Sequence, residues 1–573
     1  MGHNLAAAAA IAFLALQLSQ ASADVVAYDW RLTPIMTAFD GVRLQTLGVN
    51  GKPSNEAVIE VKLGQDVEVH VTNQLAEATC LHWHGMKQLG TQEMDGMSGF
   101  TQCAIEPNTS ATYRYTPDKA GTSGGIVTTA PSTHGRHLPR AATGSCSLGH
   151  DLHQQLRTLQ LHRGSFAQPH GLQPDAAAIA FDFVPGRKYL LRLIMAMGAF
   201  EFSIDDHEFQ VIAAGTEPVV PTKLLNSIVI NVGQRYDIIV QAKEEARGVG
   251  SFWMRAKGLT GYPWTARTAS TGTAGFNDEG LAIISYDPAN IAEPTSQEAK
   301  TMVTIGEFDF VPADPVALPI KPEYRTYMRS GINVTLGTGI VSIDGGEFYS
   351  LVVPDEPPLL SIASGVSAVD LPATANARAI GYGDHVEVVL MNDVLEQHPF
   401  HLHSHVAWVV GSGHASAKDV YSNNLHALKL EGVMVRDVYT VPPCTINEKA
   451  QCVDVGYVVL RFKADNPGLW MMHCHIEWHM SVGMGMIYIE GETELQTKGP
   501  SASSKSLLSV CKSTTDTNDE PGVLGFAEQK SGDYAYPDEE ALKDSRNYQN
   551  ANTGTKLLSS SIEIKPPSGC SGQ

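Results

Sequence analysis

Residues 473–484 read His-Cys-His-Ile-Glu-Trp-His-Met-Ser-Val-Gly-Met, so that a cysteine stands between two histidines. Successive side chains of an extended strand point to opposite sides, which puts Cys474 on one face and both His473 and His475 on the other. The thiolate and the two imidazoles can then serve different metal ions. The alternative, that Cys474 is half of a disulfide, is disfavoured by the flanking histidines. The run therefore predicts neighbouring metal sites joined by one strand.

Two more histidine clusters lie far upstream, at His82-Trp83-His84 and at residues 398–405, which read His-Pro-Phe-His-Leu-His-Ser-His. One His-x-His pair alone is typical of an ordinary strand surface, but three clusters at the ends of predicted strands are not. Two imidazoles, a thiolate and a weak axial methionine form the blue-copper pattern. We predict this set to be His398, Cys474, His479 and Met484.

Short β-branched and partly alternating segments recur along the chain, separated by many of its 52 glycines and 31 prolines. This pattern favours β-sandwiches over helical bundles. We expect strands at residues 58–63, 66–71, 187–195, 227–232, 235–240, 385–391 and 456–462.

The first and last parts of the chain resemble each other. Residues 64–73 (GQDVEVHVTN) resemble residues 383–392 (GDHVEVVLMN), and residues 114–121 (RYTPDKAG) resemble residues 461–468 (RFKADNPG). The first and last domains therefore look like copies with a middle domain between them. The predicted organisation is a signal peptide at 1–23, domains at 24–165, 166–320 and 321–500, and a polar C-terminal extension at 501–573.

The chain has 573 residues, with 61 acidic against 40 basic side chains and a formal net charge of −21. Such a surface repels nucleic acid and anionic membranes, so neither is expected as a partner. The apolar run at residues 5–16 is too short to span a bilayer and is followed by Ala21-Ser22-Ala23, which is typical of a signal peptidase site. We therefore expect a secreted, extracellular glycoprotein with sequons at Asn108 and Asn333.

Extracellular cysteines tend to pair. Cys444 and Cys452 enclose a short loop and are candidates for a local disulfide. Several pairings remain open for the candidates that could tie distant parts together, which are Cys80, Cys103, Cys511 and Cys570.

These motifs resemble the multicopper oxidases, specifically the laccase, ascorbate oxidase and ferroxidase group, over about residues 25–491. The run at residues 473–484 is highly specific to that family. The resemblance implies an all-β fold of three cupredoxin-like Greek-key β-sandwich domains and four copper ions: one type 1, one type 2 and a type 3 pair. By motif it implies His398, Cys474 and His479 for type 1, His82 and His401 for type 2, and His84, His403, His473 and His475 for type 3.

The family has a further His-Ser-His motif in its first domain, and this chain lacks it. His473 follows Gly468 by five residues, so the repeat places the missing first histidine five residues after Gly121, at position 126. Residues 122–128 instead read Thr-Ser-Gly-Gly-Ile-Val-Thr. Positions 126 and 128 hold isoleucine and threonine, and the type 3 pair is incomplete in the chain as written.

A shifted reading frame accounts for the missing motif. The codons of residues 124–128, GGN GGN ATH GTN ACN, can read TGG TGG CAT AGT CAC one nucleotide upstream, which encodes Trp-Trp-His-Ser-His with its histidines at positions 126 and 128. We hypothesise a frameshift or a mis-assigned exon over about residues 123–163, a segment that also loses strand patterning. An intact transcript encoding Ile126 and Thr128 in frame would contradict it. The alternative is a variant domain whose replacement ligands are His134, His137, His150 and His153.

Two carboxylates are candidate catalytic residues. Asp95 resembles the family's acid beside the type 2 copper, because Cys103 follows at the family's spacing; its alternative role is that of a turn aspartate before a glycine. Glu477 could relay protons or accept a hydrogen bond that orients a histidine ligand. His405 is expected to be structural.

The resemblance implies a monomeric laccase-like enzyme that couples one-electron oxidation of phenols or aromatic amines to reduction of dioxygen to water. Ascorbate and ferrous iron are the alternative donors within the same enzyme class. An alternative of another class is a copper-binding electron carrier that lost oxygen reduction together with its His-Ser-His motif.

Overall fold

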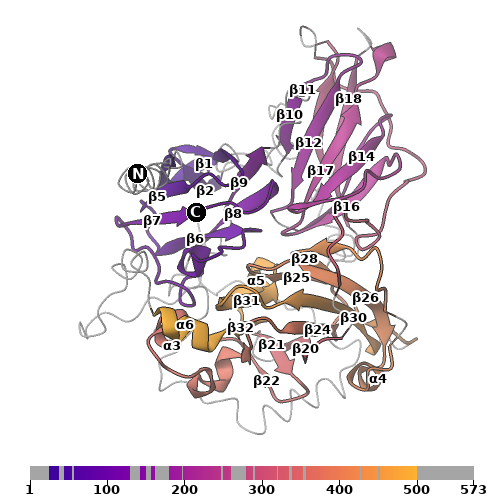
Figure 1. Ribbon diagram of the computed structural model, residues 1–573. Coiled ribbons are helices and arrows are strands. Elements are labelled where there is room, and N and C mark those ends of the chain that lie inside the picture. Colours follow the sequence, from indigo (N-terminus) through magenta and orange to yellow (C-terminus); the bar gives the residue numbers. More distant parts are fainter. Residues whose placement is uncertain are drawn as a thin grey trace, which may run out of the picture.

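The computed structural model describes residues 25–37, 44–53, 57–129, 142–149, 157–161, 180–196, 198–246, 250–259, 279–287, 289, 291–318, 321–333, 338–352, 357–425, 428–448 and 452–499. Strands dominate these residues and form three β-sandwiches, which confirms the all-β fold (Figure 1). The predicted signal peptide and the polar C-terminal extension lie outside the described residues. Within the described part, no helix is both long enough and apolar enough to cross a membrane.

The first sandwich pairs a five-stranded sheet with a four-stranded sheet. The five-stranded sheet has the order β3 (Lys52–Pro53), β2 (Leu44–Val49), β1 (Val26–Thr37), β5 (Val67–Asn73) and β7 (Ser110–Tyr115). The other has the order β4 (Val58–Lys62), β9 (Ala142–Gly149), β8 (Gly121–Thr129) and β6 (Thr79–His84). A short 3-10 helix, η2 (Gln92–Asp95), follows β6 and carries Asp95.

The second sandwich contains two five-stranded sheets. One has the order β10 (Arg157–Leu161), β12 (Lys188–Ile194), β17 (Arg235–Gln241), β14 (Phe209–Ala214) and β15 (Glu217–Pro218). The other has the order β11 (Ala180–Asp182), β19 (Glu279–Ser285), β18 (Ser251–Gly258), β13 (Ala199–Ile204) and β16 (Ser227–Asn231), and η5 (Glu244–Ala246) follows β17. β10 lies before the predicted domain boundary near residue 165, but it pairs with β12 of this second sandwich. The boundary itself stays a prediction.

The third sandwich holds the larger sheets. Its first sheet contains β22 (Phe348–Tyr349), β21 (Thr338–Ile343), β20 (Tyr324–Asn333), β24 (His385–Asn392), β30 (Cys452–Lys463), β26 (Ala407–Ala415), β27 (Val435–Arg436) and β29 (Thr445–Ile446). Its second contains β23 (Ala377–Ile380), β32 (Gly485–Glu490), β31 (Gly468–Cys474), β25 (His398–Leu402) and β28 (Val438–Val441). The helices are α3 (Pro358–Ala363), η6 (Ala368–Asp370), η7 (Ala373–Ala375), α4 (Ala417–Tyr421), α5 (Glu477–Ser481) and α6 (Glu492–Lys498).

The strands expected from alternation are present, because apolar side chains at every second position bury one face of a sheet. In β5 the valines at 67, 69 and 71 are buried while the residues between them are less so. The segment around residues 123–163 is different: β9 and β10 form there although the sequence shows no strand pattern. Ladder hydrogen bonds come from the backbone, so a segment can pair with neighbouring strands even where its sequence does not favour a strand.

The internal repeat has a structural counterpart. Asn73, at the end of β5, donates to the carbonyl oxygens of Glu77 and Ile105. Asn392, at the end of β24, donates in the same way to Glu396 and Pro442. Each asparagine thereby holds the loop that leads to a histidine cluster. The same pair of hydrogen bonds therefore precedes the first and the second histidine cluster.

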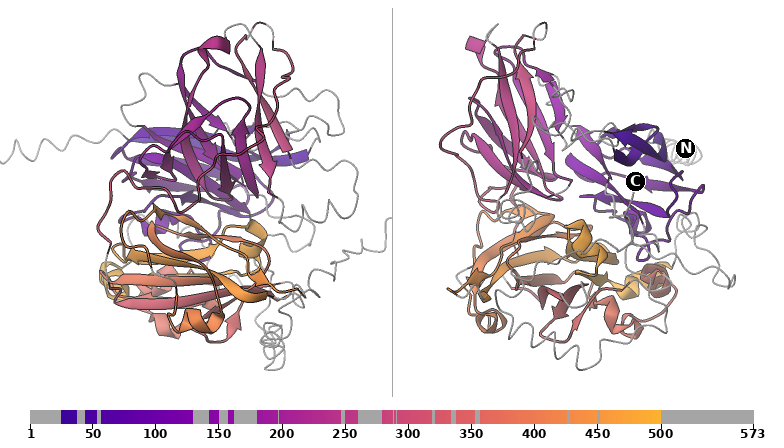
Figure 2. Two further views of the ribbon diagram at one scale, coloured as in Figure 1. Left: turned by 90° about the vertical axis from the view of Figure 1, so that its right-hand side faces the viewer. Right: turned by 180° about the vertical axis from the view of Figure 1, so that it is seen from behind.

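The three sandwiches meet at one place. Figure 1 shows β6 and β8 of the first sandwich facing β25, β31 and α5 of the third, with the second sandwich reaching both through the ends of its strands. Figure 2 shows the same meeting point from two further directions. Cys444 and Cys452 form the local disulfide expected from their spacing. Cys103 is also disulfide-bonded.

Candidate metal centre

Antiparallel strand pairs carry the histidine clusters. In the third sandwich β31 runs beside β25, and their register sets His401 opposite His473. In the first sandwich β6 runs beside β8, with His82 opposite Ile126. Ladder hydrogen bonds fix these registers, and β6 and β8 face β25 and β31 where the two sandwiches meet (Figure 1).

The first group contains His398, Cys474 and His479, which are all buried and whose ligand atoms lie within 4.8 Å of one another. The Sγ atom of Cys474 is 3.4 Å from Nδ1 of His479. Met484 is fully buried, and its main-chain N–H donates to the carbonyl of His479 at 2.9 Å while its carbonyl accepts from Cys474 at 3.0 Å. The structure therefore brings His398, Cys474 and His479 together and places the main chain of Met484 beside Cys474 and His479.

The ring nitrogens of His398 show whether this group suits a metal. Both are buried, and neither has a hydrogen-bond partner among the described residues. Burial lowers the pKa of His398 to about 3, so the imidazole is neutral and keeps a lone pair for a ligand. Burial raises the pKa of the Cys474 thiol, which a bound cation would offset by favouring the thiolate. This donor set fits copper.

A second group of imidazoles lies between the first and third sandwiches and contains two close pairs. Nδ1 of His84 is 3.4 Å from Nε2 of His475, and Nε2 of His403 is 3.0 Å from Nε2 of His473. The ligand atoms of His82, His84 and His401 also lie within 4.8 Å of one another. All six imidazoles predicted for the cluster are thus gathered in one buried place.

Hydrogen bonds decide which nitrogen of each ring faces the others. Nδ1 donates to a carbonyl oxygen in His82 (Asp95, 2.8 Å), His401 (Asp437, 2.9 Å) and His473 (Cys474, 2.9 Å). Nε2 is therefore the acceptor nitrogen of these rings. The Nε2 atoms of His82 and His401 are buried without a hydrogen-bond partner in the described part of the chain, which again suits a metal ion.

Asp95 lies beside this cluster and holds two of its rings. Its Oδ2 is 2.9 Å from Nδ1 of His403, and its Oδ1 is 3.4 Å from Nδ1 of His82. Burial alone would raise the pKa of this carboxyl, but the charge and hydrogen bonds of His403 and His82 hold its pKa well below the ordinary value. Asp95 therefore stays ionised and orients these imidazoles, beyond the turn role open to it from the sequence.

The position of the missing motif faces the cluster. Ile126 is buried on β8 and lines a cavity together with His84, His475 and Glu477. This is the side on which the pair of His84 and His475 lacks a third imidazole. Burial raises the pKa of Glu477 to about 7.

Models of the multicopper oxidase family match three parts of the chain, at residues 32–124, 153–289 and 352–494. Laccase-1 of Botryotinia fuckeliana is 31% identical over 505 residues, which cover 80% of each protein. This chain belongs to the multicopper oxidases. Its likeness also extends to the iron transport multicopper oxidase fio1 of Schizosaccharomyces pombe, which is 28% identical over 81% of this chain and 76% of that protein.

Solved structures agree on the fold. The crystal structure of Fet3p, described as a multicopper oxidase that functions in iron import, has a TM-score of 0.70 at 22% identity and covers 88% of this chain and 97% of its own. The laccase of Botrytis aclada has a TM-score of 0.66 at 24% identity, with 87% and 95% covered. The three-sandwich architecture is therefore that of the family.

The family matches leave a gap between residues 124 and 153. The gap begins just before Ile126 and lies within the segment for which we hypothesise a shifted reading frame. The replacement ligands considered for a variant domain, among them His134 and His153, lie outside the described residues.

Sequence reasoning missed three charged residues at the site of this oxidase. Arg235 of β17 and Asp437 before β28 touch His84, and Glu396 lies 3.7 Å from Nε2 of His479. Glu396 stands two residues before His398 and could have been noticed. Arg235 and Asp437 belong to no histidine motif, and no local signal marks them. His405, expected to be structural, is buried with its Nε2 3.0 Å from Oε2 of Glu490.

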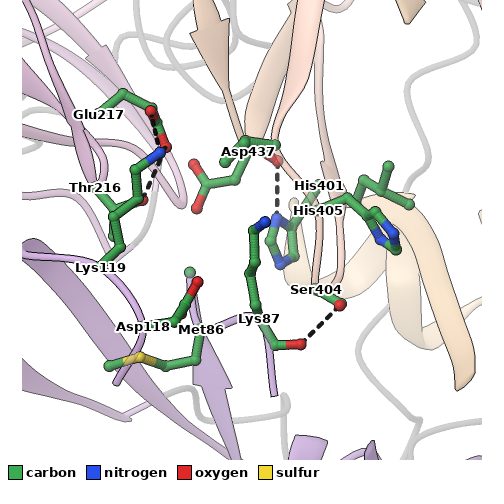
Figure 3. Close-up of a pocket in the computed structure, with 13 residues that line it drawn as sticks. Met86, Lys87, Asp118, Lys119, Thr216, Glu217, His401, Ser404, His405 and Asp437 are labelled. Atoms are coloured by element: carbon green, nitrogen blue, oxygen red, sulfur yellow. Dashed lines mark hydrogen bonds and ion pairs between the residues drawn. The ribbon is translucent and has the colours of Figure 1, made fainter. Parts of the chain in front are cut away.

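A second pocket opens where the three sandwiches meet (Figure 3). Lys119 of the first sandwich and Glu217 of the second form an ion pair across it, and His401 forms part of its wall. Ser404 closes another side by donating to the carbonyl of Lys87 at 2.7 Å. The pocket therefore reaches one of the imidazoles predicted to hold the type 2 copper.

Proposed function

We propose that this multicopper oxidase is laccase-like: it couples one-electron oxidation of phenols or aromatic amines to the reduction of dioxygen to water. His398, Cys474 and His479 with Met484 hold the type 1 copper, and His82 and His401 hold the type 2 copper. The type 3 pair is bound by His84 with His475 and by His403 with His473. Copper at these positions supplies one-electron redox chemistry and an oxygen-binding centre.

The single observation that carries the proposal is the position of Cys474. Its thiol lies within the first group, while the adjacent residues His473 and His475 reach into the second. One strand thereby gives a short covalent path between the place where a donor is oxidised and the place where oxygen is reduced. Four donor molecules give four electrons, and with four protons these convert one dioxygen to two waters.

The test is to express the full chain with copper and measure visible absorption and oxygen uptake with a phenolic donor. A blue band with oxygen uptake supports the oxidase. A blue band without uptake favours the electron carrier, which the isoleucine at position 126 makes a specific second candidate. Absence of both copper binding and blue colour would contradict either function.

Ferrous iron is a competing donor, because a carboxylate stands beside the first group. Glu396 is 3.7 Å from Nε2 of His479, and burial raises its pKa to about 7, so the carboxylate is the dominant form above that pH. An anion there attracts a metal cation more than a neutral phenol. If iron is the donor, oxidation should strengthen as the pH rises through about 7.

We expect Glu396→Gln to lower kcat/KM for ferrous iron about tenfold or more and to change kcat/KM for phenols less, since unit charges about 4 Å apart interact by about 4 kcal/mol at an effective dielectric constant of about 20, before desolvation costs. Steady-state kinetics with both donors measure this. Glu431→Gln, which neutralises an exposed acid of the same sandwich, is the control. An equal loss for both donors would remove the argument for iron.

Glu477 is proposed as a proton donor to the oxygen-reducing cluster. It lines the cavity beside His84 and His475, and because burial raises its pKa to about 7 it is protonated below that pH. We expect oxygen reduction to fall as the pH rises through about 7, and Glu477→Gln to remove that limb and slow the reaction about a hundredfold, the size of a general-acid contribution. A pH profile of kcat that is unchanged in the variant would contradict this role.

We also propose that the protein is secreted, glycosylated and monomeric. The apolar run at residues 5–16, with Ala21-Ser22-Ala23 after it, supports secretion, and Asn108 is exposed as a modified asparagine must be. N-terminal sequencing of the natural protein tests secretion, and mass determination before and after deglycosylation tests glycosylation.

A further inference from the structure

Ser404 stands between two histidines and has a backbone conformation that is unusual for serine. Its φ is +65°, in the left-handed region that glycine adopts readily and that residues with a Cβ avoid. Strain of this kind persists only where the surrounding structure holds it, and it gathers at functional sites. The contacts of Ser404 therefore show what the strained residue does.

The left-handed turn separates the directions of the two histidines. In a continuous strand, side chains two positions apart face the same side. Here Nε2 of His403 lies 3.0 Å from Nε2 of His473 in the cluster. By contrast, Nε2 of His405 lies 3.0 Å from Oε2 of Glu490. The turn at Ser404 thus brings one histidine into the cluster and directs the next to a different partner.

The hydroxyl of Ser404 makes a contact with the first sandwich. It donates to the carbonyl oxygen of Lys87 at 2.7 Å, as Figure 3 shows, and it accepts from Nδ2 of Asn466 at 2.7 Å. The same Nδ2 donates to the carbonyl oxygen of Lys87 at 2.6 Å. Ser404 and Asn466 are both buried. These three residues, Ser404, Asn466 and Lys87, form what we call the latch.

The third-sandwich side of the latch is held by further hydrogen bonds. The main-chain N–H of Asn466 donates to Oε1 of Glu490, and its carbonyl accepts from Nε1 of Trp470 at 2.7 Å. Glu490 is also the carboxylate that contacts His405. Asn466 is therefore fixed from two directions and can in turn fix the carbonyl of Lys87.

The latch lies beside predicted ligands of both sandwiches. Lys87 comes three residues after His84 on the first-sandwich side. Ser404 comes directly after His403 on the third-sandwich side. The rings of His82 and His403, one from each sandwich, have centres 4.0 Å apart. A site assembled from two sandwiches keeps such spacings only while its parts are held to within about 0.5 Å.

We propose that Ser404 is a positioning residue whose hydroxyl holds the first and third sandwiches at the separation that the copper cluster requires. The inference rests on the proposed copper cluster. Glycine would be free of strain at this position, but it has no hydroxyl to donate to Lys87 and to accept from Asn466. The type 1 group draws its ligand atoms from the third sandwich alone, so it should not depend on the latch.

The experiment compares the copper-loaded full chain with Ser404→Gly and Ser404→Ala. Both variants lose the hydroxyl, but only alanine keeps a Cβ at a φ of +65°, so it should lower the unfolding temperature more than glycine does. Both should keep the blue absorption and bind cluster copper about tenfold more weakly, the lower end of the cost of changes around a metal ligand. A competing chelator, titrated in while retained copper is counted, measures this loss.

Ser330→Ala is the matched control. Ser330 is also buried, and its hydroxyl donates to the carbonyl of Met391 at 3.0 Å within the third sandwich, so its loss should leave the cluster affinity unchanged. An equal loss in this control would overturn the role of Ser404. So would unchanged cluster affinity in both Ser404 variants, or a loss in the alanine variant alone, which would follow stability instead of the latch.

The unaltered chain gives two further outcomes. Blue absorption with no cluster copper bound would overturn the inference, because there would be no cluster for the latch to position. Absence of both blue absorption and bound copper would mean that the proposed function itself fails, which is a different result.

Discussion

Histidines placed at positions 126 and 128 should turn the chain as written into an efficient oxygen-reducing enzyme. Ile126 lines the cavity beside His84 and His475, where a third imidazole would complete one half of the type 3 pair. The repeat places the second missing imidazole at position 128. We expect Ile126→His with Thr128→His to raise oxygen uptake about a hundredfold or more, since even changes around a metal ligand cost 10–100-fold.

Oxygen uptake with a phenolic donor measures this gain, when the variant and the unaltered chain are compared at concentrations that give the same blue absorption. The matched control is Ile126→Gln with Thr128→Gln, which adds polar groups of similar size without imidazoles and should gain nothing. Oxygen uptake that is already rapid in the unaltered chain would show that the type 3 pair is complete without these positions. No gain from the histidines, with copper bound, would contradict the placement of the missing motif.

Cys474→Ser should abolish the blue absorption and lower donor oxidation by more than about a hundredfold, because it removes a ligand and not merely a partner of one. Serine keeps the shape of the side chain but replaces the soft thiolate, on which the blue-copper site depends. The six imidazoles of the second group remain, so cluster copper should still bind. Visible and electron paramagnetic resonance spectra, together with copper counts, separate the two sites.

Met484→Leu is the companion variant. It leaves the thiolate and both imidazoles in place, so the blue absorption should persist while loss of the weak axial thioether raises the reduction potential. A redox titration of the blue band measures that shift. Blue absorption that survives in Cys474→Ser would show that the site lies elsewhere, whereas colour lost in Met484→Leu would show that the methionine is more than a weak axial ligand.

Much of the fold could be predicted because its signals are local. The alternating valines of β5 identify one buried sheet face, and the matching segment before His398 identifies its copy at β24. The strand of His473 and Cys474 likewise follows from alternation alone. Short elements such as η2 could not be predicted, since a few residues of 3-10 helix depend on what packs against them.

The sequence by itself determined the ligand types, their order along the strands and the absence of imidazoles at positions 126 and 128. Tertiary structure decided which nitrogen of His403 and of His401 faces the other imidazoles, because the partners that fix it come from elsewhere: Asp95 for His403 and the carbonyl of Asp437 for His401. Asp95 and His403 are 308 residues apart. Contacts across such a separation depend on how the three sandwiches pack, and local patterns in the sequence do not specify that packing.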